Sequence, residues 1–199
     1  MNTREKILGE ALRLFSVKGY HAVSVRDIAG AVGIKESSLY NHFKNKQDIF
    51  DKLVDAQWER ARRYFESRAL PFEKGDDITD FQETDFEKLA ERVIAVFAYF
   101  VEDEENIRFR RLLILSQYEN DKAKEIYRSL YRDYMLDFQT HLFARLIQAG
   151  ILRRENPAEL AIEFYGPVFL YLHTSETAQE AKVGIRRHLK QFLSAYAVK

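Results

Sequence analysis

The 199-residue sequence contains no cysteine, only three prolines and eight glycines, and no long apolar run. The lack of cysteine excludes a disulfide framework and thiolate metal sites. The scarcity of proline and glycine leaves little room for a turn-rich β architecture and favours helices. No segment approaches the about 20 apolar residues that a membrane span needs, and no apolar signal core precedes the first amphipathic stretch. We therefore expect a cytoplasmic, all-α protein with no membrane segment.

Patterns that carry catalytic or metal chemistry are also missing. His141, His173 and His188 lie far apart, with no HxxxH spacing, and the acidic stretch GDDITDFQETDFE lacks the ligand spacing of an EF-hand loop. Catalytic triads assemble from distant residues, but nothing here nominates one. We predict no cofactor, no metal site and no enzymatic activity.

The formal net charge is zero, which argues against a protein that coats nucleic acid indiscriminately. The distribution is less even. Residues 1–50 carry eight basic and five acidic side chains, whereas the other 149 residues carry 23 basic and 26 acidic ones. The N-terminal segment is therefore the better candidate for a nucleic-acid-binding surface.

Helix start and stop signals divide the chain into about nine helices. Five starts combine a capping side chain with an apolar repeat of helical period: Asn2, Ser24, Asn45, Thr84 and Asn156. The last helix is expected from about Thr177 to Val198. Glycines 19, 33 and 150 mark helix ends. Residues 68–84, with Pro71 and Gly75, form the one long break. No alternating pattern long enough for a strand is present.

Two short helices joined by a glycine-containing turn and packed on a third are typical of a helix-turn-helix. Its second helix must bury one side and expose the other to the major groove. In GIKESSLYNHF (33–43), Leu39 and Phe43 serve the first need. Ser37, Ser38 and Asn41 serve the second, because short polar side chains let the backbone approach the base edges. Lys44 and Lys46 follow where phosphates would flank the groove.

The stretch LFSVKGYHAVSVRDIAGAVGIKESSLYNHFKNKQDIF (14–50) resembles the DNA-binding domain of the TetR family of bacterial transcriptional regulators. The resemblance covers residues 3–50, and its matching positions are Gly19, Ile28-Ala29, Gly33, Leu39-Tyr40, His42-Phe43 and Lys46. It implies that Tyr40, His42 and Lys46 bind phosphates and that Ser37, Ser38 and Asn41 face bases or sugars. Arg26 would reach a base edge or a phosphate. With Lys35, Glu36 and Lys44, these residues are the predicted DNA-binding set.

Two positions depart from the family pattern. The family usually has Ser or Thr as the cap where Lys35 stands, and the lost cap costs about 1 kcal/mol. A small or basic residue is common at Glu36, whose carboxylate would repel phosphate but could accept from a cytosine amino group. Both changes affect which operator is read rather than the fold.

For residues 51–199 the resemblance implies dimerisation and an effector pocket, which gives domains 1–50 and 51–199. Apolar residues surround the predicted helix after Pro157 and form a stripe on the last helix, so both need cover. We predict a two-fold four-helix interface; a buried central helix in a monomer is the alternative. The predicted interface residues are Phe164, Val168, Tyr171, Leu172, Ile185, Leu189, Phe192 and Tyr196.

Aromatic side chains are abundant after residue 50 and suit a cavity for a small apolar or aromatic ligand. The candidate lining residues are Trp58, Tyr64, Tyr99, Arg111, Tyr118 and Tyr165. Arg111 could pair with a ligand carboxylate or with residues 102–105.

The sequence thus predicts a homodimeric repressor whose recognition helices enter successive major grooves of a pseudo-palindromic operator. Ligand binding would shift a hinge near residues 46–66 and oppose DNA binding. Two alternatives remain open: a DNA-binding regulator with no small-molecule effector, and a helical enzyme or carrier that uses the C-terminal cavity.

Overall fold

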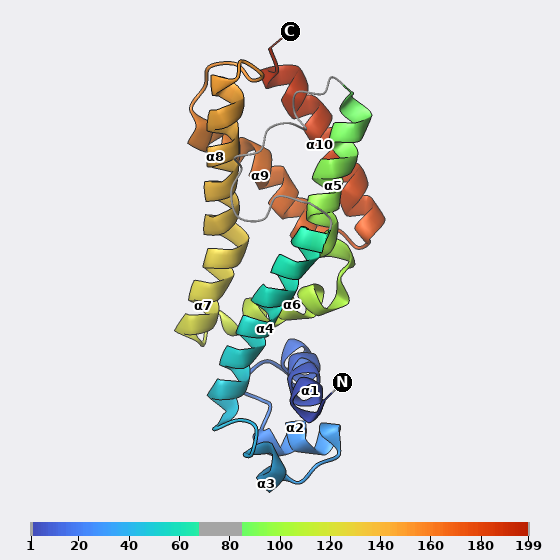
Figure 1. The fold of residues 1–199 in the computed structure, drawn as a ribbon, viewed down its shortest axis with the longest axis vertical. Coiled ribbons are helices and arrows are strands. Elements are labelled where there is room, and N and C mark those ends of the chain that lie inside the picture. The colour runs from blue at the N-terminus through green and yellow to red at the C-terminus, as the bar shows by residue number, and fades with distance from the viewer. Residues whose placement is uncertain (1, 68–84, 199) are drawn as a thin grey trace. The chain divides into compact units, whose positions relative to one another are not determined.

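The computed structural model describes residues 2–67 and 85–198 (Figure 1). These residues form α1 (Thr3–Lys18), α2 (Val25–Val32), α3 (Glu36–Leu39), α4 (Lys46–Ser67), α5 (Phe86–Glu102), α6 (Glu104–Ser116), α7 (Asp121–Arg128), a π-helical turn η2 (Ser129–Asp133), α8 (Tyr134–Gln148), α9 (Pro157–Thr174) and α10 (Ala178–Tyr196). Because α7, η2 and α8 follow one another without a break, the described chain has nine separate helices. Its only β-structure is an isolated bridge between Leu152 and Ala197. The predicted all-α fold is confirmed.

Local capping signals start most of these helices, as predicted. Asn2 and Ser24 each accept a hydrogen bond from the backbone three residues later, within reciprocal capping boxes. The Asn45 side chain accepts from the Asp48 N–H at 2.8 Å, and Asn156 and Thr177 cap α9 and α10 in the same manner. Each cap satisfies an N–H group that has no partner inside its own helix.

The start of α5 differs from the prediction. Asp85 is the cap residue, and its side chain accepts from the Glu87 N–H at 3.0 Å. The predicted cap, Thr84, and the predicted break at 68–84 lie outside the described residues.

The chain divides into two compact units. Unit 1 comprises Met1–Arg62 and Glu104–Tyr127, and unit 2 comprises Arg63–Asp103 and Arg128–Lys199. Unit 1 therefore takes in most of α4 and all of α6 besides the helix-turn-helix. The assignment of separate functions to residues 1–50 and 51–199 stays a prediction.

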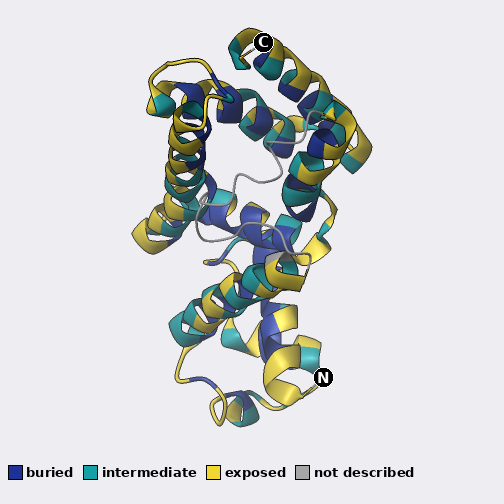
Figure 2. Cartoon of the chain, turned by 45° about the horizontal axis from the view of Figure 1, so that its top comes forward, coloured by how far each residue is buried: buried dark blue, intermediate teal, exposed yellow. Residues whose placement is uncertain are grey.

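The core of unit 1 lies between α1 and the helices packed on it, chiefly α2 and α6. Ile7, Ala11 and Phe15 on α1 are fully buried. They recur at intervals of four residues, which places them on one side of the helix. The other side of α1 is exposed (Figure 2).

The core of unit 2 is formed by α9 packed against α8 and α10, with α5 packed on α10. Phe164 on α9 is central to it. Its ring centroid lies 5.7 Å from that of Phe143 on α8, 5.1 Å from that of Phe192 on α10, and 6.5 Å from that of Phe97 on α5. Aromatic rings from four helices thus meet at one residue of α9.

Candidate nucleic-acid interface

The turn between α2 and α3 is fixed by its backbone. Gly33 ends α2 in the left-handed region, at φ 77°, a conformation that costs glycine little because it lacks a Cβ atom. The Gly33 N–H bonds to carbonyls of α2, and the Ile34 N–H bonds to the Ala29 carbonyl at 3.0 Å. These bonds close α2 and direct the chain into α3.

Residues 36–43 separate into a buried side and an exposed side. Leu39 is 0% exposed and Phe43 is 2% exposed. Ser37, Asn41 and His42 are exposed, Tyr40 keeps 49% of its surface, and Ser38 is half-buried. The helix itself ends at Leu39, and the N–H groups of His42 and Phe43 bond to the Leu39 carbonyl at 2.9 and 3.1 Å. A compact polar surface therefore lies over an apolar support. A segment that enters the major groove and contacts base edges requires this arrangement.

The two positions that depart from the family pattern behave differently. Lys35 occupies the cap position of α3, but its side chain makes no capping hydrogen bond. Glu36 forms an ion pair with Arg26 of α2, whose Nε lies 3.6 Å from a carboxylate oxygen. Because both side chains of the pair are substantially exposed, salt screens the attraction and the pair contributes little stability.

The two lysines after α3 are placed in different environments. Lys44 is exposed, and its backbone N–H donates to the Asp48 carboxylate at 2.9 Å. Lys46, at the start of α4, is only partly exposed, and its Nζ donates to the carbonyls of Tyr20 and Val23, each at 3.0 Å. Only Lys44 therefore presents its ammonium freely to solvent.

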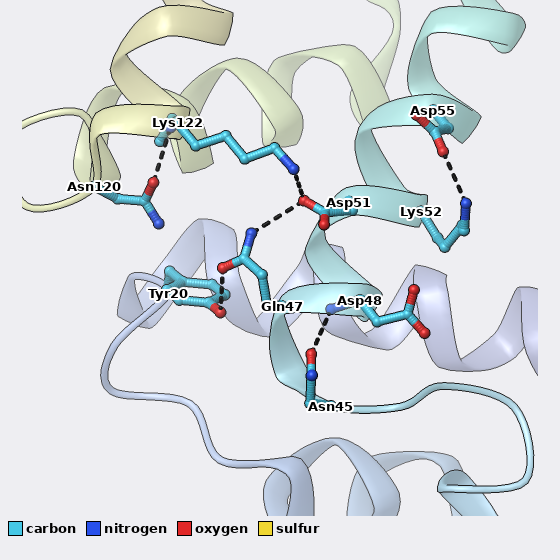
Figure 3. A network of polar contacts seen from close by, with 10 residues as sticks. Tyr20, Asn45, Gln47, Asp48, Asp51, Lys52, Asp55, Asn120 and Lys122 are labelled. Atoms are coloured by element: carbon cyan, nitrogen blue, oxygen red, sulfur yellow. Dashed lines mark hydrogen bonds and ion pairs between the residues drawn. The ribbon is translucent and has the colours of Figure 1, made fainter.

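A polar network links the start of α4 to two other parts of unit 1 (Figure 3). The Tyr20 hydroxyl donates to Gln47 Oε1 at 3.0 Å, and Gln47 Nε2 donates to Asp51 Oδ1 at 3.0 Å. Asp51 also pairs with Lys122 at the start of α7. Burial raises the pKa of Asp51, but the hydrogen bonds from Lys122 and Gln47 outweigh it, so the pKa lies below its ordinary value. The sequence analysis did not single out Tyr20 or Gln47, because their partners lie 27 and four residues away.

Comparison with known proteins agrees with this arrangement. A family model described as "Bacterial regulatory proteins, tetR family" matches residues 7–53, which span α1 to the first turns of α4. The helix-turn-helix region of the chain therefore matches the TetR family. The predicted resemblance is confirmed.

A curated relative is similar to this chain over a segment of comparable length. The biofilm operon icaADBC HTH-type negative transcriptional regulator IcaR of Staphylococcus epidermidis is 44% identical over 52 residues. That match spans 26% of this chain and 28% of IcaR, so the chain spans little more than a quarter of the curated relatives it matches. The similarity in sequence to IcaR thus covers about a quarter of each chain.

Two solved structures share the fold of the whole chain. SmeT, the repressor of the Stenotrophomonas maltophilia multidrug efflux pump SmeDEF, has a TM-score of 0.68 at 24% identity, over 100% of this chain and 92% of SmeT. A SmeT–triclosan complex has a TM-score of 0.69 at 22% identity, over 100% of this chain and 93% of that one. The TetR-type fold therefore extends beyond the region of sequence similarity.

The six predicted ligand-lining residues fall into both units. Trp58, Arg111 and Tyr118 belong to unit 1 and are exposed. Tyr64, Tyr99 and Tyr165 belong to unit 2. Within unit 2 the rings of Tyr64 and Tyr99 lie 4.7 Å apart. Their role in ligand binding stays a prediction.

Tyr99 and Tyr165 belong to a series of aromatic residues in unit 2 that contact one another in turn. The Tyr99 ring contacts Phe100 at 5.4 Å, and the Phe100 ring contacts Tyr131 at 6.1 Å. The Tyr165 hydroxyl donates to the Tyr131 carbonyl at 2.8 Å. The series gives α4, α5, η2 and α9 a shared apolar region.

The predicted dimer-interface residues lie largely inside unit 2. Tyr171 and Tyr196 are half-buried, and the other six are buried within the chain itself: Phe164, Val168, Leu172, Ile185, Leu189 and Phe192. The apolar side chains that α9 and α10 leave exposed are others: Ile162, Leu170 and Val183, at 60, 55 and 54%. Helical period alone could not separate the two sets, because α9 is apolar nearly all round.

Membrane-spanning helices and metal-binding clusters are both absent from the described residues. No described helix is long and apolar enough to cross a membrane. Within the same residues, no group of three or more His, Asp or Glu side chains is arranged to hold a metal ion.

Proposed function

We propose that the protein is a homodimeric transcriptional repressor that binds a pseudo-palindromic DNA operator through α3 and is released by a small apolar or aromatic ligand. The observation that carries the proposal is the division of residues 36–43, in which Leu39 and Phe43 are buried and the polar side chains are exposed. Among the exposed side chains, those of Ser37 and Asn41 are short, which lets the backbone approach the base edges of the major groove. IcaR and SmeT, described as a negative regulator and a repressor, support the sign of regulation.

In the proposed complex, Ser37 and Asn41 contact base edges, and Tyr40, His42 and Lys44 contact phosphates on either side of the groove. Hydroxyl and amide groups can both donate and accept, which suits the mixed pattern of donors and acceptors in the major groove. Arg26 reaches a base edge, since its pairing through Nε leaves the two terminal nitrogens of the guanidinium available.

The proposed operator contacts are tested with DNA from the region upstream of the gene. Binding is measured by fluorescence anisotropy for the unmodified protein, Tyr40→Phe, Asn41→Ala and Lys190→Ala. The first two substitutions remove a predicted contact, and we expect each to weaken binding by about tenfold. Lys190 is exposed on α10 in unit 2, so Lys190→Ala controls for removal of a surface group. Equal binding by all four proteins would mean that residues 36–43 do not contact the operator.

The proposed dimer uses the exposed apolar side chains of α9 and α10 rather than the buried ones. Ile162 and Leu170 are eight residues apart and therefore share one side of α9, with the exposed Gly166 between them. We expect a mass in solution of twice the 23.5 kDa of one chain. Leu170→Glu would place a charge in this surface and give a monomer, whereas Leu115→Glu, at an exposed leucine of α6 in unit 1, would leave the dimer intact.

The proposed effector binds beside the aromatic series of unit 2. The solved SmeT–triclosan complex supports an aromatic ligand for this fold. Triclosan and a panel of aromatic compounds are titrated into the protein–DNA complex and, separately, into the free protein. Linkage requires that a ligand which releases DNA binds more weakly by the same factor when DNA is present. If no compound that binds the protein changes its affinity for DNA, the protein would be a regulator without a small-molecule effector.

A further inference from the structure

The ammonium group of Lys46 has a full set of partners inside unit 1. Its Nζ donates to the carbonyl oxygens of Tyr20 and Val23, each at 3.0 Å, and lies 3.5 Å from the carbonyl oxygen of His21. It also stands over the Tyr20 ring, 4.4 Å from the centroid. A lysine ammonium has three donor hydrogens, so these acceptors and the ring face account for its bonding capacity.

The surface beneath this ammonium is rigid. Tyr20 is 8% exposed, and its ring packs against Phe15 and Phe50 with centroids 5.3 and 5.2 Å away. Its hydroxyl is held by Gln47, which is itself held by Asp51 (Figure 3). The ring that faces Lys46 is therefore fixed by contacts to α1 and α4.

The three carbonyls belong to the segment that joins α1 to α2. They lie after the end of α1 at Gly19 and before Ser24, which caps α2. Carbonyls in such a turn have no partners from a neighbouring helix ladder, and one ammonium that gathers several of them fixes the path of the turn. Lys46 itself begins α4, so it ties this path to the first turn of α4.

A DNA phosphate would have to compete with this arrangement. Turning the Lys46 ammonium outward would break two 3.0 Å hydrogen bonds to carbonyls and the contact with the Tyr20 ring. Partial burial already lowers the pKa of Lys46 below its ordinary value, which reflects an ammonium partly withdrawn from water. Lys44, two residues earlier, is exposed and carries no such constraint.

We propose that Lys46 is a positioning residue of the DNA-binding unit, which holds the α1–α2 turn against the start of α4 and does not bind phosphate. The placement of α2, and of α3 after it, depends on that turn. This inference rests on the proposed function, and it reassigns one residue that the family resemblance places among the phosphate ligands.

The salt dependence of DNA binding separates the two roles. Each phosphate contact adds about 0.9 to the slope of log affinity against log salt concentration. We expect Lys46→Met to weaken binding by about tenfold at every salt concentration, with the slope of the unmodified protein. Lys44→Met is the matched comparison, because it removes the same group from an exposed position. A slope reduced by about 0.9 per chain in Lys46→Met would overturn the proposal, as would affinity and slope that are both unchanged.

A variant that preserves the charge provides a second test, which still applies if Lys46→Met does not fold. Lys46→Arg keeps the positive charge but replaces a compact ammonium with a planar fork that does not fit the same carbonyls. Positioning predicts weaker binding with an unchanged slope, whereas a phosphate contact predicts nearly full affinity.

Hydrogen exchange tests the positioning without DNA. Lys46→Arg should speed amide exchange in residues 19–28, and Lys44→Arg should leave these amides unchanged. If no DNA is bound by the unmodified protein, the proposed function fails, and the exchange result still decides whether Lys46 holds the turn. Unchanged exchange in Lys46→Arg would overturn the positioning role.

Discussion

In the helix-turn-helix of unit 1 each helix has a narrow buried side, whereas in unit 2 the central helix α9 is apolar on most sides. In residues 36–43 the support is two residues, Leu39 and Phe43, and the rest of the surface is polar. On α9, Leu160, Phe164 and Val168 are buried while Ile162 and Leu170 remain exposed. The first pattern fixes a single orientation of the helix. The second is compatible with several, and only the packing of α8, α5 and α10 around α9 selects one.

The largest expected effects come from truncating one core aromatic in each unit. Phe43→Ala and Phe164→Ala each remove a buried ring, and we expect each to lower the free energy of unfolding by about 3–5 kcal/mol. Amide exchange should rise mainly in α1–α3 for Phe43→Ala and in α8–α10 for Phe164→Ala. Equal loss of protection in both units from either substitution would contradict their independence as cores.

Alanine substitutions at two glycines should change the free energy of unfolding in opposite directions. A Cβ atom on Gly184 of α10 would lie 2.5 Å from Cε1 of Tyr171, and Arg187 holds the hydroxyl of that tyrosine at 3.1 Å. We expect Gly184→Ala to destabilise by about 1–3 kcal/mol, because the ring must shift. Gly9→Ala on α1 meets no atom within 4 Å and should stabilise by about 0.5–1 kcal/mol. Urea denaturation measures both, and a stable Gly184→Ala variant would show that Tyr171 moves freely.

Substitutions at the helix caps of unit 1 should change the free energy of unfolding by smaller amounts. Ser24 caps α2, whereas Lys35 at the start of α3 provides no side-chain cap. Lys35→Ser should therefore raise the free energy of unfolding by about 1 kcal/mol, and Ser24→Ala should lower it by a similar amount. Thermal unfolding compares the two variants. A neutral Lys35→Ser would indicate that water already satisfies the first N–H groups of α3.

The smallest expected effects are on pH dependence. Burial lowers the pKa of His188 on α10 below 6.5, although the Phe164 carbonyl, 2.9 Å from Nε2, opposes the shift. The unfolded chain then takes up the proton first, so unit 2 loses some stability as the pH falls from 6.5 towards the folded pKa. His188→Gln should remove this loss.

In unit 1 the corresponding loss occurs at lower pH. Hydrogen bonds from the side chain and backbone of Ser24 lower the pKa of Asp27 below 3.8. Its contribution is therefore complete above 3.8 and is lost as the pH falls through the folded value. Amide exchange of α2 and α10 between pH 7 and pH 3 should show the α10 change first. The reverse order would contradict both assignments.

Local signals in the sequence predict much of the fold. Asn2, Ser24 and Asn156 were expected to start helices, and each does so through a hydrogen bond to a backbone N–H two or three residues later. Glycines 19, 33 and 150 were expected at helix ends, and each has a positive φ. Such bonds join neighbours in the chain, so their partners can be read directly from the sequence.

The candidate site was predictable only in part. The exposed side of residues 36–43 follows from the spacing of Leu39 and Phe43, which are four residues apart. The partners of Lys46 do not, because Tyr20 and Val23 lie 26 and 23 residues away. An aromatic residue directly after the glycine that ends α1 was the one available signal, and it does not identify Lys46 as its partner.

The sequence by itself determined most of the helix ends that a capping side chain or a glycine marks, and which side of residues 36–43 is polar, because these features depend on residues within one or two helical turns. Only the tertiary structure decided that Lys46 faces carbonyls, that Glu36 pairs with Arg26, and which apolar residues of α9 are buried. These outcomes depend on which distant backbone or side chain packs against each group. The helical period is the same for every candidate partner, so the sequence pattern cannot choose between them.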